Sequence, residues 1–247
     1  MYQTEWQGIK FSNFIQVKSR KLADSNFYQA YYQEFFKRYQ SWDQLDPGWR
    51  KDKERCAKKI IEWTHPNSKI LSIGCGSGYM EHYIHNQKGV GDLFIHEVAP
   101  LAWKWIESEF PEDRKFLGFI PGCLPQDIYF DLIYLSAVDY AIDNASLVKF
   151  LSTIRNYLNG GKLVIISASF QETPVTLIDK LMWTLRHMKD CIISILDYLG
   201  LYSRGQFWGW LRTKNEYYSL LKKAGYTEIK DGFVNPDTRL HYWISGR

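Results

Sequence analysis

A short apolar segment that runs directly into three closely spaced glycines constrains this chain most. Residues 69–81 read Lys-Ile-Leu-Ser-Ile-Gly-Cys-Gly-Ser-Gly-Tyr-Met-Glu, which places glycine at positions 74, 76 and 78. A strand that leads into such a turn and then into a helix leaves backbone N–H groups facing a ligand. The pattern therefore predicts an open α/β fold with a ligand-binding turn after its first strand.

Apolar segments and helical segments alternate along the chain after this turn. We expect strands at 69–73, 93–97, 116–120, 130–135 and 162–167, and helices at 80–86, 99–110 and 145–158. Strands separated by helices of this length imply right-handed crossovers and a parallel sheet. A further helix at 215–224 and two strands at 227–233 and 241–245 are expected in the tail.

The remaining segments predict additions to one α/β domain that covers residues 1–247. After an irregular lead at residues 1–25, helices are expected at 26–40, with Asn26 as the cap, and at 49–63. The expected parts are an N-terminal helical cap (1–65), a core (66–170), a helical insertion or lid (171–213) and a C-terminal helix with strands (214–247).

An apolar stripe marks the insertion. Its members recur every three or four residues: Leu177, Leu181, Leu185, Met188, Ile192, Leu196 and Leu199. Such a stripe favours packing against the core. There are two alternatives. The stripe could be a surface for a lipid-bearing substrate, with peripheral lipid contact, or it could be the seam of a homodimer. The charged residues among them argue against a transmembrane span.

Charge and cysteine usage exclude several classes of protein. The net charge is only +4 and the basic residues are dispersed among acids, which argues against nucleic acid as a partner. The four cysteines are far apart without metal-ligand spacing, so neither zinc nor a disulfide framework is expected. The N-terminus carries no signal-peptide pattern, and a cytoplasmic location is the expectation.

Two phosphate-binding classes fit the glycine turn poorly. The dinucleotide fingerprint needs Gly-x-Gly-x-x-Gly, but Tyr79 occupies its third glycine position and Gly78 comes one residue early. No Gly-Lys-Ser/Thr follows, so a Walker loop is absent as well.

The segment Ile-Leu-Ser-Ile-Gly-Cys-Gly-Ser-Gly instead resembles the first motif of class I S-adenosylmethionine-dependent methyltransferases. The resemblance continues in the family's order with Glu97, residues 130–134, residues 139–143 and the Gly-Gly turn that ends the segment 155–161. It covers roughly residues 55–170. It implies a Rossmann-like α/β fold with a mostly parallel seven-stranded sheet flanked by helices, and S-adenosylmethionine as cofactor.

The resemblance also implies site residues. Glu97 would accept hydrogen bonds from both ribose hydroxyls, because a carboxylate at the end of the second strand suits them. The cofactor-binding candidates are Gly74, Cys75, Gly76, Gly78, Glu97, Val98, Ile120 and Ser136. The catalytic candidates are Asp139 and Tyr140 after the fourth strand, and His82 in the first helix. Asp139, Asp143 and Asn144 together are more typical of a helix cap than of a metal site, and no metal is expected.

Three positions depart from the family pattern. Ser72 stands where strand 1 usually carries an acid directed at the methionine amino group, and Ile120 stands where an acid often meets the adenine amine. Tyr140 replaces the usual histidine. Backbone groups and the N-terminal helices are the alternative sources of these contacts.

The expected function is methyl transfer to a hydroxyl, or an amine, of a small molecule or glycan. Aromatic residues on both sides of the core could supply ring faces for such an acceptor: Tyr28, Tyr31, Tyr32, Trp42, Trp49, Trp183, Phe207, Trp208 and Trp210. The alternative is a catalytically inactive protein of the same fold that acts as a binding or regulatory module.

Overall fold

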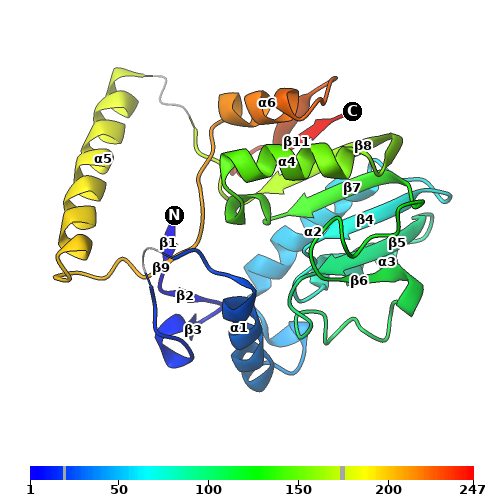
Figure 1. Cartoon of the computed structure of the whole chain (residues 1–247), viewed down its shortest axis with the longest axis horizontal. Coiled ribbons are helices and arrows are strands. Elements are labelled where there is room, and N and C mark those ends of the chain that lie inside the picture. Colours follow the sequence, from blue (N-terminus) through cyan, green and yellow to red (C-terminus); the bar gives the residue numbers. More distant parts are fainter. Residues whose placement is uncertain (19–20, 173–175) are drawn as a thin grey trace.

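The computed structural model describes residues 1–18, 21–172 and 176–247. A seven-stranded sheet in the order β10-β11-β8-β7-β4-β5-β6 forms its centre (Figure 1). The strands are β4 (Lys69–Ile73), β5 (Asp92–Glu97), β6 (Lys115–Leu117), β7 (Phe130–Ser136), β8 (Leu158–Ser167), β10 (Lys230–Asn235) and β11 (Leu240–Gly246). Only the pairs β10–β11 and β11–β8 are antiparallel. The predicted mostly parallel α/β fold is confirmed.

Helices cover both faces of the sheet. On one face, α2 (Pro47–Ile61) and α3 (Tyr79–His85) pack in a cluster that includes Leu132 of β7. On the other face, α4 (Asn144–Arg155) and α6 (Lys214–Lys223) pack in a cluster that includes Ile133 of β7. Successive strand residues point to opposite faces, so an almost wholly apolar strand such as β7 serves both layers.

A third cluster joins the N-terminal helix to a distant loop. α1 (Ser25–Arg38) buries Phe27, Tyr31 and Phe35 against Phe11 and Trp208. The N-cap of α1 is Asp24, whose carboxylate accepts the N–H of Phe27 at 3.0 Å. It lies two residues before the predicted cap, Asn26. This aromatic cluster lies beyond the carboxyl ends of the central strands and closes that side of the sheet.

The first residues are more regular than the sequence indicates. They form the short strands β1 (Tyr2–Gln3), β2 (Glu5–Trp6) and β3 (Ile9–Lys10), followed by the 3₁₀ turn η1 (Phe11–Asn13). β1 pairs with β9 (Gln206–Phe207), about two hundred residues away. Two-residue strands show no periodicity of their own, because their pairing is set by a distant partner.

The segment 99–110 is not the predicted α-helix. Its backbone forms successive turns, with the N–H of Ala102 on the carbonyl of Ala99 and the N–H of Ile106 on that of Trp103. Trp103, Ile106 and Phe110 pack in the cluster below α2 and α3. Burial of these large side chains, rather than α-helical bonding, sets the path of this segment.

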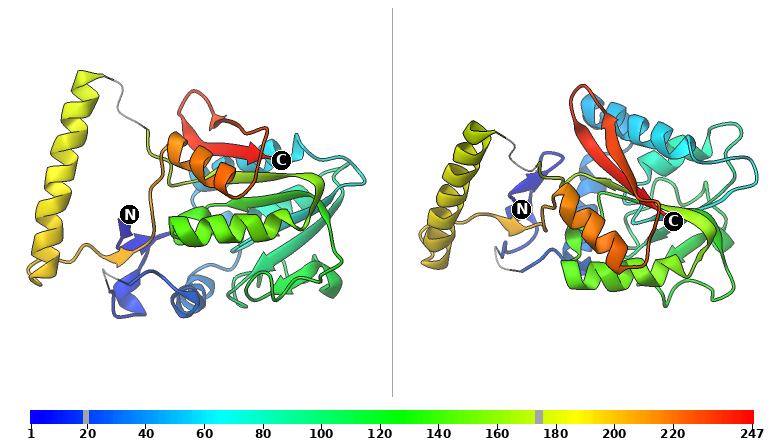
Figure 2. Two further views of the ribbon diagram at one scale, coloured as in Figure 1. Left: turned by 45° about the horizontal axis from the view of Figure 1, so that its top comes forward. Right: turned by 90° about the horizontal axis from the view of Figure 1, so that it is seen from above.

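The apolar stripe of the insertion does not pack against the core, so that prediction is wrong. α5 (Leu177–Tyr198) carries the stripe and stands apart from the sheet in all three views (Figures 1 and 2). Leu177 is 85% exposed and Met188 58%. Within the described residues, no helix combines the length and the apolar character that crossing a membrane requires.

Candidate functional site

A cavity of about 210 Å³ lies at the carboxyl ends of β4, β5 and β7, beneath the N-terminal aromatic cluster. Open parallel sheets bind ligands at this edge. The lining includes six of the predicted cofactor residues: Gly74, Cys75, Gly76, Glu97, Val98 and Ser136. Tyr140, a predicted catalytic residue, also lines it.

The glycine turn has a shape that other residues would not tolerate. Gly74, Gly76 and Gly78 all have positive φ, between +57° and +76°. A Cβ at Gly74 would lie 2.5 Å from Val138 Cγ2, and one at Gly78 2.3 Å from Ile106 Cδ1. Gly78 does not line the cavity and instead begins α3. At Gly76 a Cβ would lie 2.9 Å from the Tyr32 hydroxyl, across the cavity edge.

Glu97 is fixed by this turn. Its Oε2 accepts the N–H of Gly76 at 2.8 Å, and its Oε1 accepts the N–H of Val98 at 2.7 Å and of Ala99 at 3.3 Å. The side chain is buried, and burial raises the pKa of the carboxyl while these backbone bonds oppose the shift. The Glu97 carboxylate thus lies at the end of β5 and is held in one orientation.

A second carboxylate, which the sequence did not single out, lines the cavity from α3. Glu81 Oε1 accepts the Ser72 hydroxyl at 2.6 Å and the Tyr134 hydroxyl at 2.8 Å. The residue is only 2% exposed, and its Oε2 has no hydrogen-bond partner among the described residues. Burial raises the pKa of this carboxyl. Ser72, the departure on strand 1, therefore serves to position an acid supplied by the next helix.

His96 on β5 also lines the cavity and has one ring nitrogen without a partner in the described part of the chain. Its Nε2 lies 2.7 Å from the carbonyl of Gly118 and donates to it, while Nδ1 has no partner among the described residues. Burial lowers the pKa of the imidazole to about 4, so the ring is neutral at pH 7. A lone buried acceptor of this kind suits a hydrogen-bond donor on a ligand.

The charge around the cavity is unbalanced. Glu81 and Glu97 face it, and Lys53 of α2 is the single cationic side chain in the described lining. The Lys53 ammonium lies 3.2 Å from the Ser136 hydroxyl. Buried carboxylates cost free energy unless a cation or donors compensate them. The cavity therefore favours a ligand that carries positive charge.

Aromatic side chains form the outer wall. Six of them line the cavity: Trp6, Tyr28, Tyr32, Trp49, Tyr79 and Tyr140. Tyr140 stacks on Trp208 with ring centroids 6.0 Å apart, and burial raises the pKa of its hydroxyl to about 12. Of the aromatic residues expected to face an acceptor, Tyr31, Trp42, Phe207, Trp208 and Trp210 lie outside this lining, and the side chain of Trp183 lies outside the described residues.

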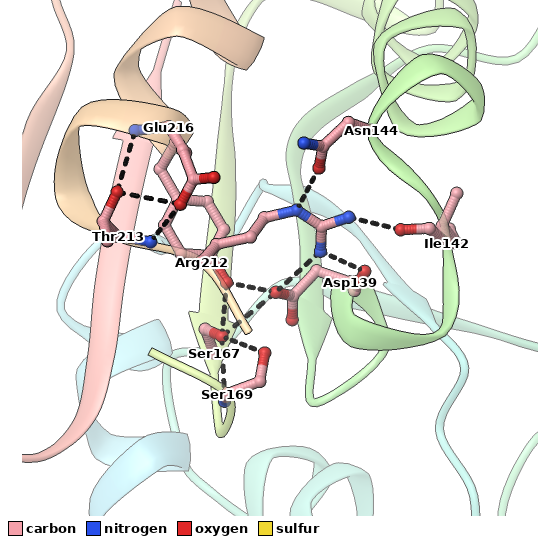
Figure 3. Close-up of polar contacts among 9 residues, drawn as sticks. Asp139, Ile142, Asn144, Ser167, Ser169, Arg212, Thr213 and Glu216 are labelled. Atoms are coloured by element: carbon pink, nitrogen blue, oxygen red, sulfur yellow. Dashed lines mark hydrogen bonds and ion pairs between the residues drawn. The ribbon is translucent and has the colours of Figure 1, made fainter. Parts of the chain in front are cut away.

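Asp139 is the main residue that the structure does not bring to the cavity. It lies in the 3₁₀ turn η4 (Asp139–Ala141), fully buried, where its Oδ2 accepts the Ser167 hydroxyl at 3.0 Å and the Tyr217 hydroxyl (Figure 3). The Arg212 guanidinium lies 4.0 Å away. Its neighbour Asp143 caps α4, as the sequence pattern indicates.

His82 and Ile120 are also elsewhere. His82 Nδ1 lies 2.7 Å from a Glu109 carboxylate oxygen, and its ring packs against Trp42 beside a separate hollow. Ile120 packs against the core cluster of α4 and α6. Their sequence positions suggested the site, but the side chains turn to other partners.

Known structures resemble this fold at low sequence identity. A candidate O-methyltransferase of Nostoc punctiforme is 15% identical with a TM-score of 0.58, covering 89% of this chain and 59% of its own. Human N-acetylserotonin methyltransferase in complex with SAM is 14% identical (TM-score 0.55; 91% and 56% covered). DhpI in complex with SAH is 13% identical (TM-score 0.60; 93% and 98% covered).

The chain thus spans less than two thirds of the first two proteins' length. No protein-family model matches the sequence, and a search of curated proteins found no match to it. The likeness shows that the chain has the Rossmann-like fold of class I methyltransferases.

Proposed function

We propose that this chain is a methyltransferase that uses S-adenosylmethionine and acts on a small molecule. The observation that carries the proposal is the pair of buried carboxylates, Glu81 and Glu97, that face one cavity beside the glycine turn. The cofactor is a cation with an ammonium group and two ribose hydroxyls, donors that suit the Glu81 oxygen without a partner among the described residues and the oriented carboxylate of Glu97. The human neighbour, in complex with SAM, and DhpI, in complex with SAH, support the same cofactor.

The ribose hydroxyls and the ammonium group of the cofactor each have a matching carboxylate. Glu97, already oriented by the amide of Gly76, would accept the ribose hydroxyls. Glu81 would accept the ammonium group on its free oxygen, while Ser72 and Tyr134 hold the other. The acid that strand 1 lacks is thereby replaced from α3.

The cofactor supplies a methyl group on a positively charged sulfur, which is already a good leaving group. The residues of this chain mainly have to align the acceptor and exclude water. The aromatic wall would do both, since the side chains of Trp6, Trp49, Tyr28 and Tyr140 line the cavity. With a pKa of about 12, Tyr140 stays protonated at neutral pH and would donate a hydrogen bond to the acceptor.

The acceptor we propose is a planar molecule with an acidic hydroxyl, or an amine. Neither of the expected bases, Asp139 and His82, lines the cavity. His96 does, but a pKa of about 4 makes it a weak base. An alcohol or sugar hydroxyl would need a stronger base, whereas a phenol or a neutral amine needs little beyond alignment. Aliphatic glycans are therefore the less favoured acceptors.

A thermal-shift titration tests the cofactor. S-adenosylmethionine and S-adenosylhomocysteine should both raise the melting temperature, and Gly76→Val and Glu97→Ala should abolish the shift. Gly89→Val is the matched control for Gly76→Val, because Gly89 shares a positive φ but its Cβ would meet no atom within 4 Å. Glu112→Ala, at a 91% exposed carboxylate, is the control for Glu97→Ala. No shift with either compound would refute the cofactor proposal.

The alternative is a binding module that has kept the fold and the cofactor. The burial of Asp139 away from the cavity favours it, because the segment after β7 then supplies no base. A panel of phenols and amines distinguishes the two functions: methyl transfer supports the enzyme, and a thermal shift without any transfer supports the module.

We also propose a reducing, cytoplasmic setting for the protein, which its four unpaired cysteines fit.

A further inference from the structure

α5 presents a long apolar surface that no part of its own chain covers in the described residues. Six side chains along it are each between 50% and 60% exposed: Leu181, Leu185, Met188, Ile192, Ile195 and Leu199. The helix connects to the rest of the chain only at its ends and stands clear of the sheet (Figure 2). Contiguous exposed apolar surface of this kind marks an interaction site.

The spacing of these six residues identifies the type of interaction. They alternate at intervals of four, three, four, three and four residues, which is the a/d pattern of a heptad repeat. Position 178, an isoleucine, continues the repeat toward the N-terminus. A 3.5-residue period keeps an apolar seam facing another helix along its whole length. The partner is therefore a helix rather than a flat surface.

The charges on α5 distinguish a second copy from a membrane. The helix carries three acids, at positions 179, 190 and 197, and three bases, at positions 180, 186 and 189. Helices that lie on membranes carry an excess of Lys and Arg on their polar face, whereas the acids and bases of α5 are equal in number. A helix with balanced charge can also meet its own copy without net repulsion.

The size of the surface suffices for a dimer. α5 has 22 residues and so is about 33 Å long. This length holds about three heptads, the minimum over which an a/d apolar pattern indicates helix pairing.

We propose that α5 pairs with α5 of a second copy of this chain through the seam formed by Leu181, Leu185, Met188, Ile192, Ile195 and Leu199. The pairing has a consequence for the cavity. The chain after α5 returns through β9, which pairs with β1, to Trp208, which stacks on Tyr140. Fixing α5 in a dimer therefore anchors one end of the segment that supports the aromatic wall. The seam itself does not depend on the proposed function.

Light scattering after size-exclusion chromatography, over a wide range of protein concentration, tests the seam. The wild-type chain should be a dimer, and Ile192→Glu and Leu185→Glu should each raise the dissociation constant about a hundredfold or more, because a carboxylate is costly in an apolar seam. Ser194→Glu places the same charge on another face, beside Arg204, and should remain dimeric. Leu185, Ile192 and Ser194 are all exposed, so the three variants should fold.

Two results would overturn the inference. One is a wild-type chain that stays monomeric at the highest concentration. Flotation of that monomer with vesicles of phosphatidylcholine and phosphatidylglycerol would then indicate a membrane as the partner. The other is a dimer that Ile192→Glu and Leu185→Glu leave intact. Circular dichroism confirms folding of each variant. Because no cofactor is present, failure here is independent of the thermal-shift result.

Discussion

Two buried carboxylates on either side of β7 are built from the same parts. Glu81 is held by a serine and a tyrosine, Ser72 and Tyr134, and Asp139 is held by Ser167 and Tyr217. Burial raises the pKa of both carboxyls, and each has one oxygen without a partner in the described residues. The two sites differ in the origin of the compensating positive charge.

Asp139 receives that charge from inside the fold. Arg212 is 1% exposed, lies 4.0 Å from the Asp139 carboxylate and also donates to the carbonyl of Asp139 at 2.7 Å and to Asn144 Oδ1 at 2.8 Å (Figure 3). It thereby ties the segment before α6 to the loop that begins α4. Glu81 forms no ion pair within the described residues and faces the cavity. Asp139 is thus paired with a cation of the fold itself. For Glu81, we propose that a bound ligand supplies the positive charge.

The largest effect is expected at Arg212. Arg212→Met leaves Asp139 buried without its cation, and removing one partner of a buried pair costs about 3–5 kcal/mol of unfolding free energy. Urea denaturation measures the loss. Arg239→Met is the matched control, since its pair with Glu172 is exposed and should contribute under about 1 kcal/mol. Equal losses in the two variants would show that Asp139 does not need Arg212.

Glu81→Gln should have the opposite pattern. It keeps the shape of the side chain and removes an uncompensated buried charge, so the unfolding free energy should stay the same or rise. Binding of S-adenosylmethionine should weaken by about tenfold to a hundredfold, because a charge-assisted hydrogen bond is worth about 1.5–3 kcal/mol. Isothermal titration measures the affinity, with Glu109→Gln as a control outside the cavity. A less stable Glu81→Gln protein with unchanged affinity would make Glu81 a structural residue like Asp139.

The pH dependence of binding sharpens this distinction. The pKa of Glu81 is raised above its ordinary value of 4.5, and only the ionised form attracts an ammonium group. Affinity should therefore fall as the pH drops through the raised pKa, by at most about tenfold per pH unit. Titrations at several pH values should show this fall in the wild-type protein, and a weaker fall in Glu81→Gln. The same slope in both proteins would assign the titration to another group.

The sequence was sufficient for the fold because the central strands and the glycine turn depend on local residues. β4 occupies residues 69–73 as predicted, and the turn positions have the positive φ that glycine favours. The α-helix predicted at 99–110 and the core packing predicted for the α5 stripe were wrong. An apolar period indicates that one face packs against something, but it does not identify the partner.

The candidate site was predictable only in part. Glu97 could be located because the crossover from Gly78 sets its distance along the chain. Glu81 could not, since a glutamate in the first turn of a helix is usually a solvated residue at the positive end of the dipole. The available signal was Ser72, a lone polar residue in an apolar strand, which had to have a buried partner. Asp139 was misassigned for the converse reason, because its partner Arg212 lies 73 residues away.

The smallest effects are expected at the two serines, which form the most closely matched pair. Ser72→Ala and Ser167→Ala each delete a hydroxyl that donates to a buried carboxylate, at about 1 kcal/mol per hydrogen bond, and Ser167 also accepts from Tyr217 and from the Ser169 N–H. Ser167→Ala should lower the unfolding free energy and leave cofactor affinity unchanged. Ser72→Ala should lower the affinity several-fold, because Glu81 loses the contact that orients it, and should affect stability less. Denaturation and titration of both variants measure the two quantities side by side. Loss of affinity in Ser167→Ala, with none in Ser72→Ala, would reverse the roles of the two carboxylates.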